Sequence, residues 1–353
     1  MPIKLDTAHL PGSLSTVVAA ATAAEEAGFD CLWTAETAHD PFFPLVLAAE
    51  HTKRIKLGTS IAVAFPRSPM VTAMIAWDLA ELSGGRFILG LGTQVKGHNE
   101  RRFSVKWDAP GPRMREYVES LRAIWDCWQN GTPLNYAGKH YQFTLMTPFF
   151  QPAPMPHWRI PVYIAGVNEY MCRLAGELCD GFHVHPFHSL KYLRETTLPN
   201  IEVGLKKSGR TRKDIQLSTS LFVITGDTPD EIEAAKDLVR QQISFYASTR
   251  TYRGVLEAHG WGDVSDQLNR KSAAGDWGGM AELITDEMLD VYAVIGRRDE
   301  IVDKIKQRYE GILDRFNFYW PYNPAEKARW APIIRTFNGG PAPGGSEQSE
   351  GRL

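Results

Sequence analysis

The chain has 353 residues, of which 43% are hydrophobic and 23% are charged, and its formal net charge is −2. This balance allows a large buried core and gives no support for a basic nucleic-acid-binding face. The uncharged stretch Leu10–Ala24 lacks the basic start and leucine-rich centre of a signal peptide. No run approaches the roughly 20 apolar residues of a membrane span. Four cysteines without CxxC spacing indicate reduced thiols in a cytoplasmic protein.

Strand-like and helix-like segments alternate along the chain. The strand candidates are Ile3–Thr7, Cys31–Thr34, Ile55–Thr59, Phe87–Leu91, Val162–Ala165, Gly181–Val184, Ile215–Ile224 and Arg315–Tyr319. The helix candidates between them are Leu14–Ala27, Pro44–Thr52, Pro69–Ser83, Arg113–Asn130, Asn168–Leu178, Leu190–Ser208, Pro229–Ala247 and Asp299–Glu310. Parallel strands need crossover helices, and eight such repeats favour a (β/α)8 TIM barrel, an α/β fold, over an open doubly wound sheet.

Two segments interrupt the alternation. After the fourth strand, residues 132–160 contain the hairpin-like stretch LNYAGKHYQF. Between the seventh and eighth strands, Ser248–Val294 reads as short helical pieces broken by glycine. We therefore expect a single barrel domain over residues 1–337 with two insertions. Residues 338–353 are rich in glycine, proline and serine and are expected to form a disordered tail.

In a barrel of this kind the chemistry lies just after the carboxyl ends of the strands. The second strand is followed by TAETAHDPFFP, which places Glu36, His39 and Asp40 between apolar residues. Such a cluster can be a base with its partner, or equally a capped turn. The candidate pocket walls are the aromatic residues Trp33, Phe42, Phe43, Phe65 and Trp107. Of these, Phe42 and Phe43 in the loop after the second strand are the least core-like.

Other strand ends exclude several common chemistries. The stretch GLGTQVKGHNE after the fourth strand is neither a dinucleotide fingerprint nor a phosphate loop. The sequence lacks a GxSxG nucleophile elbow. The stretch HVHPFH after the sixth strand brings His183, His185 and His188 together in sequence, but no HExxH motif supports a metal. We expect no metal, and we expect His185 to donate a hydrogen bond to an anionic ligand.

The junction VYIAGVNEYM at residues 162–171 leads a strand directly into a helix. Gly166, Val167 and Asn168 present backbone N–H groups at the start of that helix, and the first basic residue is Arg173. The first N–H groups of a helix lack intrahelical partners and favour an anion. With few acids and bases and much apolar surface at the strand ends, the site is typical of a protein whose cofactor carries the chemistry.

Four stretches together carry a family resemblance: FDCLWTAETAHDPF, RIKLGTSIAVAFPRSP, LSGGRFILGLGTQVKGHNE and IPVYIAGVNEYMCRLAGELCDGF. In this order and spacing they resemble the bacterial luciferase-like superfamily of barrel flavoenzymes. Within it the chain is similar to oxidoreductases that use the deazaflavin coenzyme F420.

The resemblance implies roles for individual residues. It places a non-proline cis peptide bond between Ser60 and Ile61, behind the central ring of the cofactor. It places the cofactor phosphate at the segment from Ala165 to Asn168, with Gly166 and Val167 supplying backbone N–H groups. It matches Asn99 to a polar cofactor contact.

Two adjacent positions depart from the pattern. The sugar-phosphate dehydrogenases of this group carry an Asp-His pair after the second strand, where this chain has Glu36 and Thr37. The catalytic candidates are therefore Glu36 and His39, as groups that handle protons.

The resulting hypothesis is hydride transfer between coenzyme F420 and an unidentified small organic substrate. One alternative is a monooxygenase that uses FMN and oxygen; another is a non-catalytic flavin- or deazaflavin-binding protein. The resemblance also implies a homodimer formed through early helices.

Overall fold

The structure is a computed structural model and describes residues 2–339. Eight parallel strands form a closed barrel in the order β10-β12-β1-β2-β3-β5-β8-β9, and β9 pairs with β10 to close the ring. The strands are β1 (Lys4–His9), β2 (Cys31–Thr34), β3 (Lys56–Thr59), β5 (Phe87–Gly92), β8 (Val162–Gly166), β9 (Gly181–Val184), β10 (Gln216–Gly226) and β12 (Arg315–Phe318). The predicted TIM barrel is confirmed.

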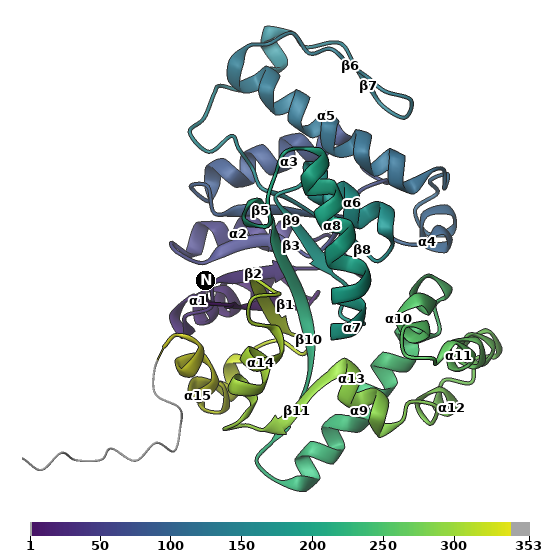
Figure 1. Cartoon of the computed structure of the whole chain (residues 1–353). Coiled ribbons are helices and arrows are strands. Elements are labelled where there is room, and N and C mark those ends of the chain that lie inside the picture. The colour runs from purple at the N-terminus through teal and green to yellow at the C-terminus, as the bar shows by residue number, and fades with distance from the viewer. Residues whose placement is uncertain (1, 340–353) are drawn as a thin grey trace, which may run out of the picture.

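Helices connect successive strands and surround the barrel (Figure 1). They are α1 (Val17–Ala27), α2 (Phe43–His51), α3 (Pro69–Leu82), α5 (Pro110–Asn130), α6 (Glu169–Leu178), α8 (Leu198–Lys207), α9 (Pro229–Ala247), α14 (Ile301–Tyr309) and α15 (Lys327–Phe337). The predicted helix Leu190–Ser208 is divided, because α7 (Leu190–Tyr192) and a π-helical turn (Leu193–Thr197) precede α8. Among residues 2–339, no helix combines the length and apolar character that crossing a bilayer requires.

Both predicted insertions are present and lie on opposite sides of the molecule (Figure 1). The first, at residues 132–160, contains the antiparallel hairpin β6 (Tyr136–Ala137) and β7 (Gln142–Phe143) beside α5. The helix α4 (Lys96–Arg101) precedes α5, in the loop after β5. The second contains α10 (Arg253–Glu257), α11 (Gly262–Ala274), α12 (Gly278–Ala281) and α13 (Asp286–Tyr292). It packs around its own hydrophobic cluster, which includes Phe187 and Phe222 from the barrel side.

The strand β11 (Ala293–Arg297) is absent from the sequence prediction. It pairs with the outer part of β10, Phe222 to Gly226, while the inner part of β10 pairs with β9 and β12. The expected strand therefore continues two residues beyond Ile224, and the predicted insertion Ser248–Val294 ends inside a strand. Residues 340–353, most of the expected tail, and Met1 lie outside the described residues.

The barrel interior is filled with large side chains. Trp33 and Tyr163 are almost fully buried, and the His183 ring lies edge-on to Trp33 with centroids 5.0 Å apart. Around the barrel, the inward faces of the helices form one continuous hydrophobic cluster. All four cysteines are buried free thiols, and burial raises the pKa of Cys179 to about 12. The interior is thus closed, and any ligand site must lie at its rim.

Candidate functional site

The predicted site residues all lie at the carboxyl end of the barrel. Glu36 and His39 follow β2, Ser60 and Ile61 follow β3, and Asn99 lies on α4 after β5. The segment from Ala165 to Asn168 spans the end of β8 and the start of α6, and His185 follows β9. Because parallel strands end at the same edge, these side chains are arranged around one mouth.

The peptide bond between Ser60 and Ile61 is cis, at the position that the resemblance indicates. We call the segment Ser60–Val63 the shelf, because Ser60 and Ile61 are partly exposed at the mouth. The Ser60 N–H donates to the Thr34 carbonyl at 2.6 Å, and the Ile61 carbonyl accepts the Glu36 N–H at 3.1 Å. The short strand β4 (Ala62–Val63) pairs with β5. The shelf is therefore fixed from both neighbouring strands.

Gly92 explains how closely the shelf packs on β5. A Cβ at this position would lie 2.7 Å from two side-chain carbons of Ile61, which is shorter than any relaxed contact. The absence of a side chain at Gly92 thus lets Ile61 lie flat against the strand. The Ala64 N–H, which follows the shelf, donates to the Gly92 carbonyl at 3.0 Å.

The Glu36 carboxylate is engaged by two donors. Its Oε2 accepts the Val63 N–H at 2.7 Å and Arg67 Nη1 at 2.6 Å, and the Glu36 side chain is 8% exposed. Arg67 Nη2 donates to Asp40 at 2.7 Å. Burial lowers the pKa of Arg67, but the bonds to Glu36 and Asp40 raise it by more, so the guanidinium stays charged. Glu36 is thus held in an ion pair beneath the shelf.

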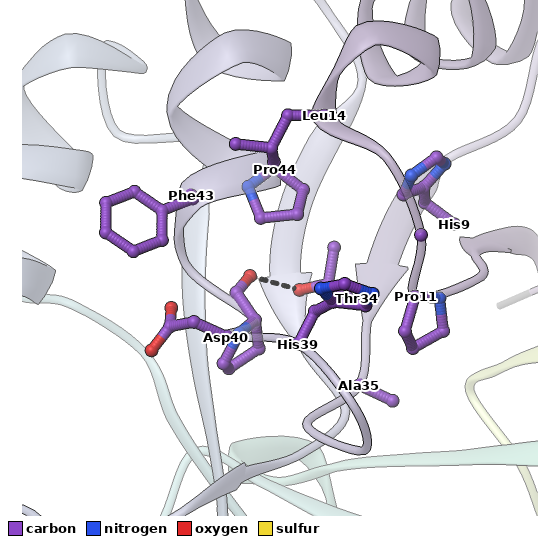
Figure 2. Close-up of a pocket in the computed structure, with 11 residues that line it drawn as sticks. His9, Pro11, Leu14, Thr34, Ala35, His39, Asp40, Phe43 and Pro44 are labelled. Carbon is purple, nitrogen blue, oxygen red and sulfur yellow. Dashed lines mark hydrogen bonds between the residues drawn. The ribbon is translucent and has the colours of Figure 1, made fainter.

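His39 lies apart from that ion pair, in a neighbouring hollow at the surface (Figure 2). The Asp40 carboxylate points away from His39 (Figure 2) and toward Arg67. His9 lines the same hollow from the end of β1; its Nε2 is buried without a partner among residues 2–339, and burial lowers its pKa. His9 was missed by the sequence reasoning, and its position at a strand end was the available signal. No hydrogen bond within the described part of the chain joins Glu36 to His39.

The predicted anion site lies at the start of α6. Asn168 caps the helix, since its Oδ1 accepts the Met171 N–H at 3.0 Å. The preceding N–H groups of the first turn point out of the helix without intrahelical acceptors. A Cβ on Gly166 would lie 2.4 Å from the Met171 Cβ, so glycine is also required for packing. The first turn contains Glu169 and no basic residue.

Asn99 is fully buried. Its Nδ2 donates to the carbonyls of Thr93 and Val95 at 2.8 and 3.1 Å, which shapes the loop after β5. Its Oδ1 has no hydrogen-bond partner within residues 2–339. The side chain therefore holds the loop with its donors and leaves one acceptor free.

His185 lies in an aromatic cluster that the sequence reasoning missed. Its ring stacks on Tyr252 at 4.2 Å and meets Tyr246 edge-on at 4.7 Å. The Tyr246 and Tyr319 hydroxyls are 2.7 Å apart. These side chains come from the end of β9, from α9 and the second insertion, and from the residue after β12. No local motif unites them, because three distant segments supply the rings.

Desolvation lowers the pKa of His185 to about 3, so the ring is neutral. Its Nδ1 accepts the Phe187 N–H at 3.1 Å, which places its proton on Nε2 and makes that nitrogen a donor. The other two histidines have different surroundings: His183 faces the interior, and His188 Nδ1 donates to the His185 carbonyl. Within residues 2–339 no group of His, Cys, Asp and Glu could hold a metal ion.

Two expected pocket walls are not at the surface. Phe42 is 4% exposed and belongs to the core, so its placement among the least core-like aromatics was wrong. Trp33, another candidate, lies in the barrel interior and donates from Nε1 to Asp6 at 2.8 Å. Phe43 is 64% exposed, as the loop composition indicated. Proline flanks both phenylalanines, so sequence alone did not separate them.

Comparisons with known proteins show the family of the chain. The family model for luciferase-like monooxygenases matches residues 1–315. An uncharacterised protein of Mycobacterium tuberculosis is 49% identical over 313 residues, which are 89% of this chain and 92% of that protein. The 5,10-methylenetetrahydromethanopterin reductase of Archaeoglobus fulgidus is 31% identical over 311 residues, covering 86% and 89% of the two chains.

Solved structures share the fold. The coenzyme F420-dependent tetrahydromethanopterin reductase of Methanopyrus kandleri superposes with a TM-score of 0.78 at 21% identity, covering 94% of this chain and 98% of that one. The oxygenating constituent of 3,6-diketocamphane monooxygenase of Pseudomonas putida, in complex with FMN, gives 0.66 at 19% identity, covering 97% and 100%. The family model covers most of the chain, and the chain therefore belongs to the luciferase-like monooxygenase family.

Proposed function

We propose that this protein is an oxidoreductase that transfers a hydride between coenzyme F420 and a small organic substrate. The observation that carries the proposal is the pairing of a partly exposed shelf, Ser60–Val63, with an open helix start at Asn168 on the same barrel mouth. The shelf can support a flat ring, and the helix start can hold an anionic tail. Similarity to the A. fulgidus reductase over most of both chains adds support.

The groups at the mouth fit this cofactor. The ring would lie on Ser60 and Ile61, and backbone N–H groups of the segment Ala165 to Asn168 would hold the phosphate. Within residues 2–339, the buried Asn99 Oδ1 is an acceptor without a hydrogen-bond partner, and the His185 Nε2–H is a donor. When bound, the deazaflavin supplies a carbon centre that carries two electrons as hydride. The protein then contributes position and exclusion of water.

The charge around α6 favours coenzyme F420 over FMN. The F420 phosphate is a diester with one negative charge, whereas the terminal phosphate of FMN carries nearly two. The first turn holds Glu169, and its cationic neighbour Arg173 is paired with it at 2.8 Å. No lysine or arginine in this turn is left to neutralise a second charge. A singly charged phosphate group therefore suits the start of this helix better.

The proton-handling candidates have distinct environments. Glu36 is held by Arg67 and Val63, so its carboxylate is fixed. His39 is exposed in the hollow that it shares with His9. We propose that His39 is the group that exchanges protons with solvent during turnover, because its imidazole is exposed at the barrel mouth.

We further propose that the chain forms a homodimer through α2 and α3, which pack side by side. Phe43 and Val46 on α2 and Val71 and Met74 on α3 are 41–64% exposed. Large apolar side chains gathered on neighbouring helices are typical of a protein interface.

The experiment that tests the function is a pair of equilibrium titrations of the purified protein, one with F420 and one with FMN, followed by cofactor fluorescence. Saturable binding of F420 at one site per chain, tighter than FMN, supports the proposal. Tighter binding of FMN together with oxygen consumption would instead indicate a flavin monooxygenase. Binding of F420 without turnover of any substrate in a broad panel would indicate a non-catalytic binding protein.

A further inference from the structure

Arg67 joins the two loops that flank the shelf. Its Nη1 donates to Glu36 Oε2 at 2.6 Å and to the Val63 carbonyl at 3.0 Å, and its Nη2 donates to Asp40 at 2.7 Å. Its guanidinium lies 5.4 Å from the centre of the buried Phe42 ring. The guanidinium thus donates to three oxygens in two loops and lies over one face of the Phe42 ring.

Glu36 joins the same loops through both its backbone and its side chain. Its N–H donates to the Ile61 carbonyl, and its Oε2 accepts the Val63 N–H. These two contacts lie on either side of Ala62, the first residue of β4, so Glu36 binds the shelf at two points. A carboxylate with a strong cationic partner and a backbone donor is held in one geometry.

We propose that Glu36 and Arg67 are positioning residues that set the shelf at the height at which it supports the cofactor ring. The inference rests on the proposed function. The inference goes beyond the proposed function because it assigns the ion pair a specific task in cofactor binding. The inference also separates the roles of the two catalytic candidates. Glu36 fixes the shelf, whereas His39 faces the neighbouring hollow.

The chain contains a matched ion pair at the opposite end of the barrel. Arg212 Nη2 donates to Asp314 Oδ2 at 2.7 Å, and the same oxygen accepts the Leu217 N–H at 2.7 Å. Arg212 also donates to the carbonyls of Ile215 and Ile312. This pair has the same chemistry as that of Arg67 and Glu36, but it lies where β10 and β12 begin, away from the mouth.

The test compares Arg67→Met and Glu36→Gln with Arg212→Met. For each variant, F420 affinity is measured by fluorescence titration, the bound cofactor by its absorption spectrum, and folding by thermal unfolding. We expect Arg67→Met to weaken F420 binding at least tenfold and to shift the absorption band of the bound cofactor. Glu36→Gln keeps the side-chain shape and should weaken binding less. Arg212→Met should lower the unfolding temperature while F420 affinity stays within twofold.

A rescue variant separates positioning from general stability. Arg67→Lys keeps the positive charge, but a lysine can contact only some of the three oxygens that Arg67 binds. The F420 affinity of this variant should therefore fall between those of wild type and Arg67→Met. Unchanged affinity and spectrum in both Arg67→Met and Glu36→Gln would overturn the inference while leaving the proposed function standing. Equal losses in Arg212→Met and Arg67→Met would overturn it too. Failure of the wild-type protein to bind F420 would overturn the proposed function and this inference together.

Discussion

Asp6 and Arg315 form a bidentate ion pair inside the barrel, with distances of 2.7 and 2.8 Å and side chains that are at most 1% exposed. The pair links β1 to β12, the first and last barrel strands. Burial lowers the pKa of Arg315, but the charge of Asp6 raises it by more, so the guanidinium remains charged. Asp6 also accepts the Trp33 indole N–H. The barrel is therefore closed by a buried charge pair as well as by backbone pairing.

Removing one member of this pair should strongly destabilise the folded protein. Arg315→Met leaves the Asp6 carboxylate buried without its counter-charge and should lower the free energy of unfolding by about 3–5 kcal/mol. Urea denaturation followed by tryptophan fluorescence measures this. The double variant Asp6→Asn with Arg315→Met buries no charge and should be less destabilised than Arg315→Met alone. If the double variant were the less stable one, an uncompensated charge could not be the cause.

Three buried histidines should make the protein sensitive to acid. Burial lowers the pKa of His183 and His185 to about 3 and that of His188 to about 4. The unfolded chain binds protons on these rings below about pH 6.5, whereas the folded chain stays neutral there. Stability should therefore be full above pH 6.5 and fall as pH drops toward 4, by up to about 1.4 kcal/mol per pH unit for each ring.

Comparing denaturant unfolding at pH 7.0 and 5.0 measures this loss. His188→Gln removes one of the three titrating rings and should give a smaller loss between the two pH values than wild type. His51 is exposed on α2 and supplies the control, because His51→Gln should leave the loss unchanged. An equal pH dependence in wild type and His188→Gln would contradict the prediction.

Glu169 should influence the choice between cofactors. A carboxylate about 6 Å from a phosphate in water repels each phosphate charge by roughly 0.7 kcal/mol. Glu169→Gln should therefore improve FMN affinity relative to F420 affinity by about threefold. Glu202 forms a similar exposed pair with Lys206 on α8, so Glu202→Gln is the matched control and should change neither affinity. A lower ratio of FMN to F420 affinity in Glu169→Gln would rule out this charge argument.

The exposed faces of α2 and α3 allow a test of the proposed dimer. Replacing Val46 and Met74 with glutamate places charges on both helices without touching the core, since each side chain is more than 40% exposed. Wild type should elute at twice the chain mass in size-exclusion chromatography with light scattering, and the double variant at the chain mass. A wild-type monomer at micromolar concentration would refute the dimer.

Much of the fold followed from local patterns. Most barrel strands contain a short apolar run, and helices such as α6 and α14 have a clear apolar face, so eight repeats could be read along the chain. The strand β11 was missed because its short run, Ala293–Arg297, directly follows helical pieces broken by glycine. Its partner, the outer part of β10, extends beyond the barrel, which local periodicity does not indicate.

The site was predictable where residues follow strands and not where distant segments meet. The shelf and the start of α6 each lie in one continuous stretch, so a motif could locate them. Arg67 is 31 residues from Glu36, and their ion pair depends on two loops that are brought together by adjacent strands. Neighbouring strand ends carrying opposite charges were the signal that could have revealed it. The aromatic cluster of His185, Tyr246 and Tyr319 has no such signal.

The most direct test of the central claim is a crystal structure of the protein with bound F420. The account predicts that the phosphate oxygens lie within hydrogen-bond distance of backbone N–H groups of the segment Ala165 to Asn168, and that the deazaflavin ring rests on Ser60 and Ile61. A phosphate bound elsewhere on the barrel, or a ring away from the shelf, would contradict it.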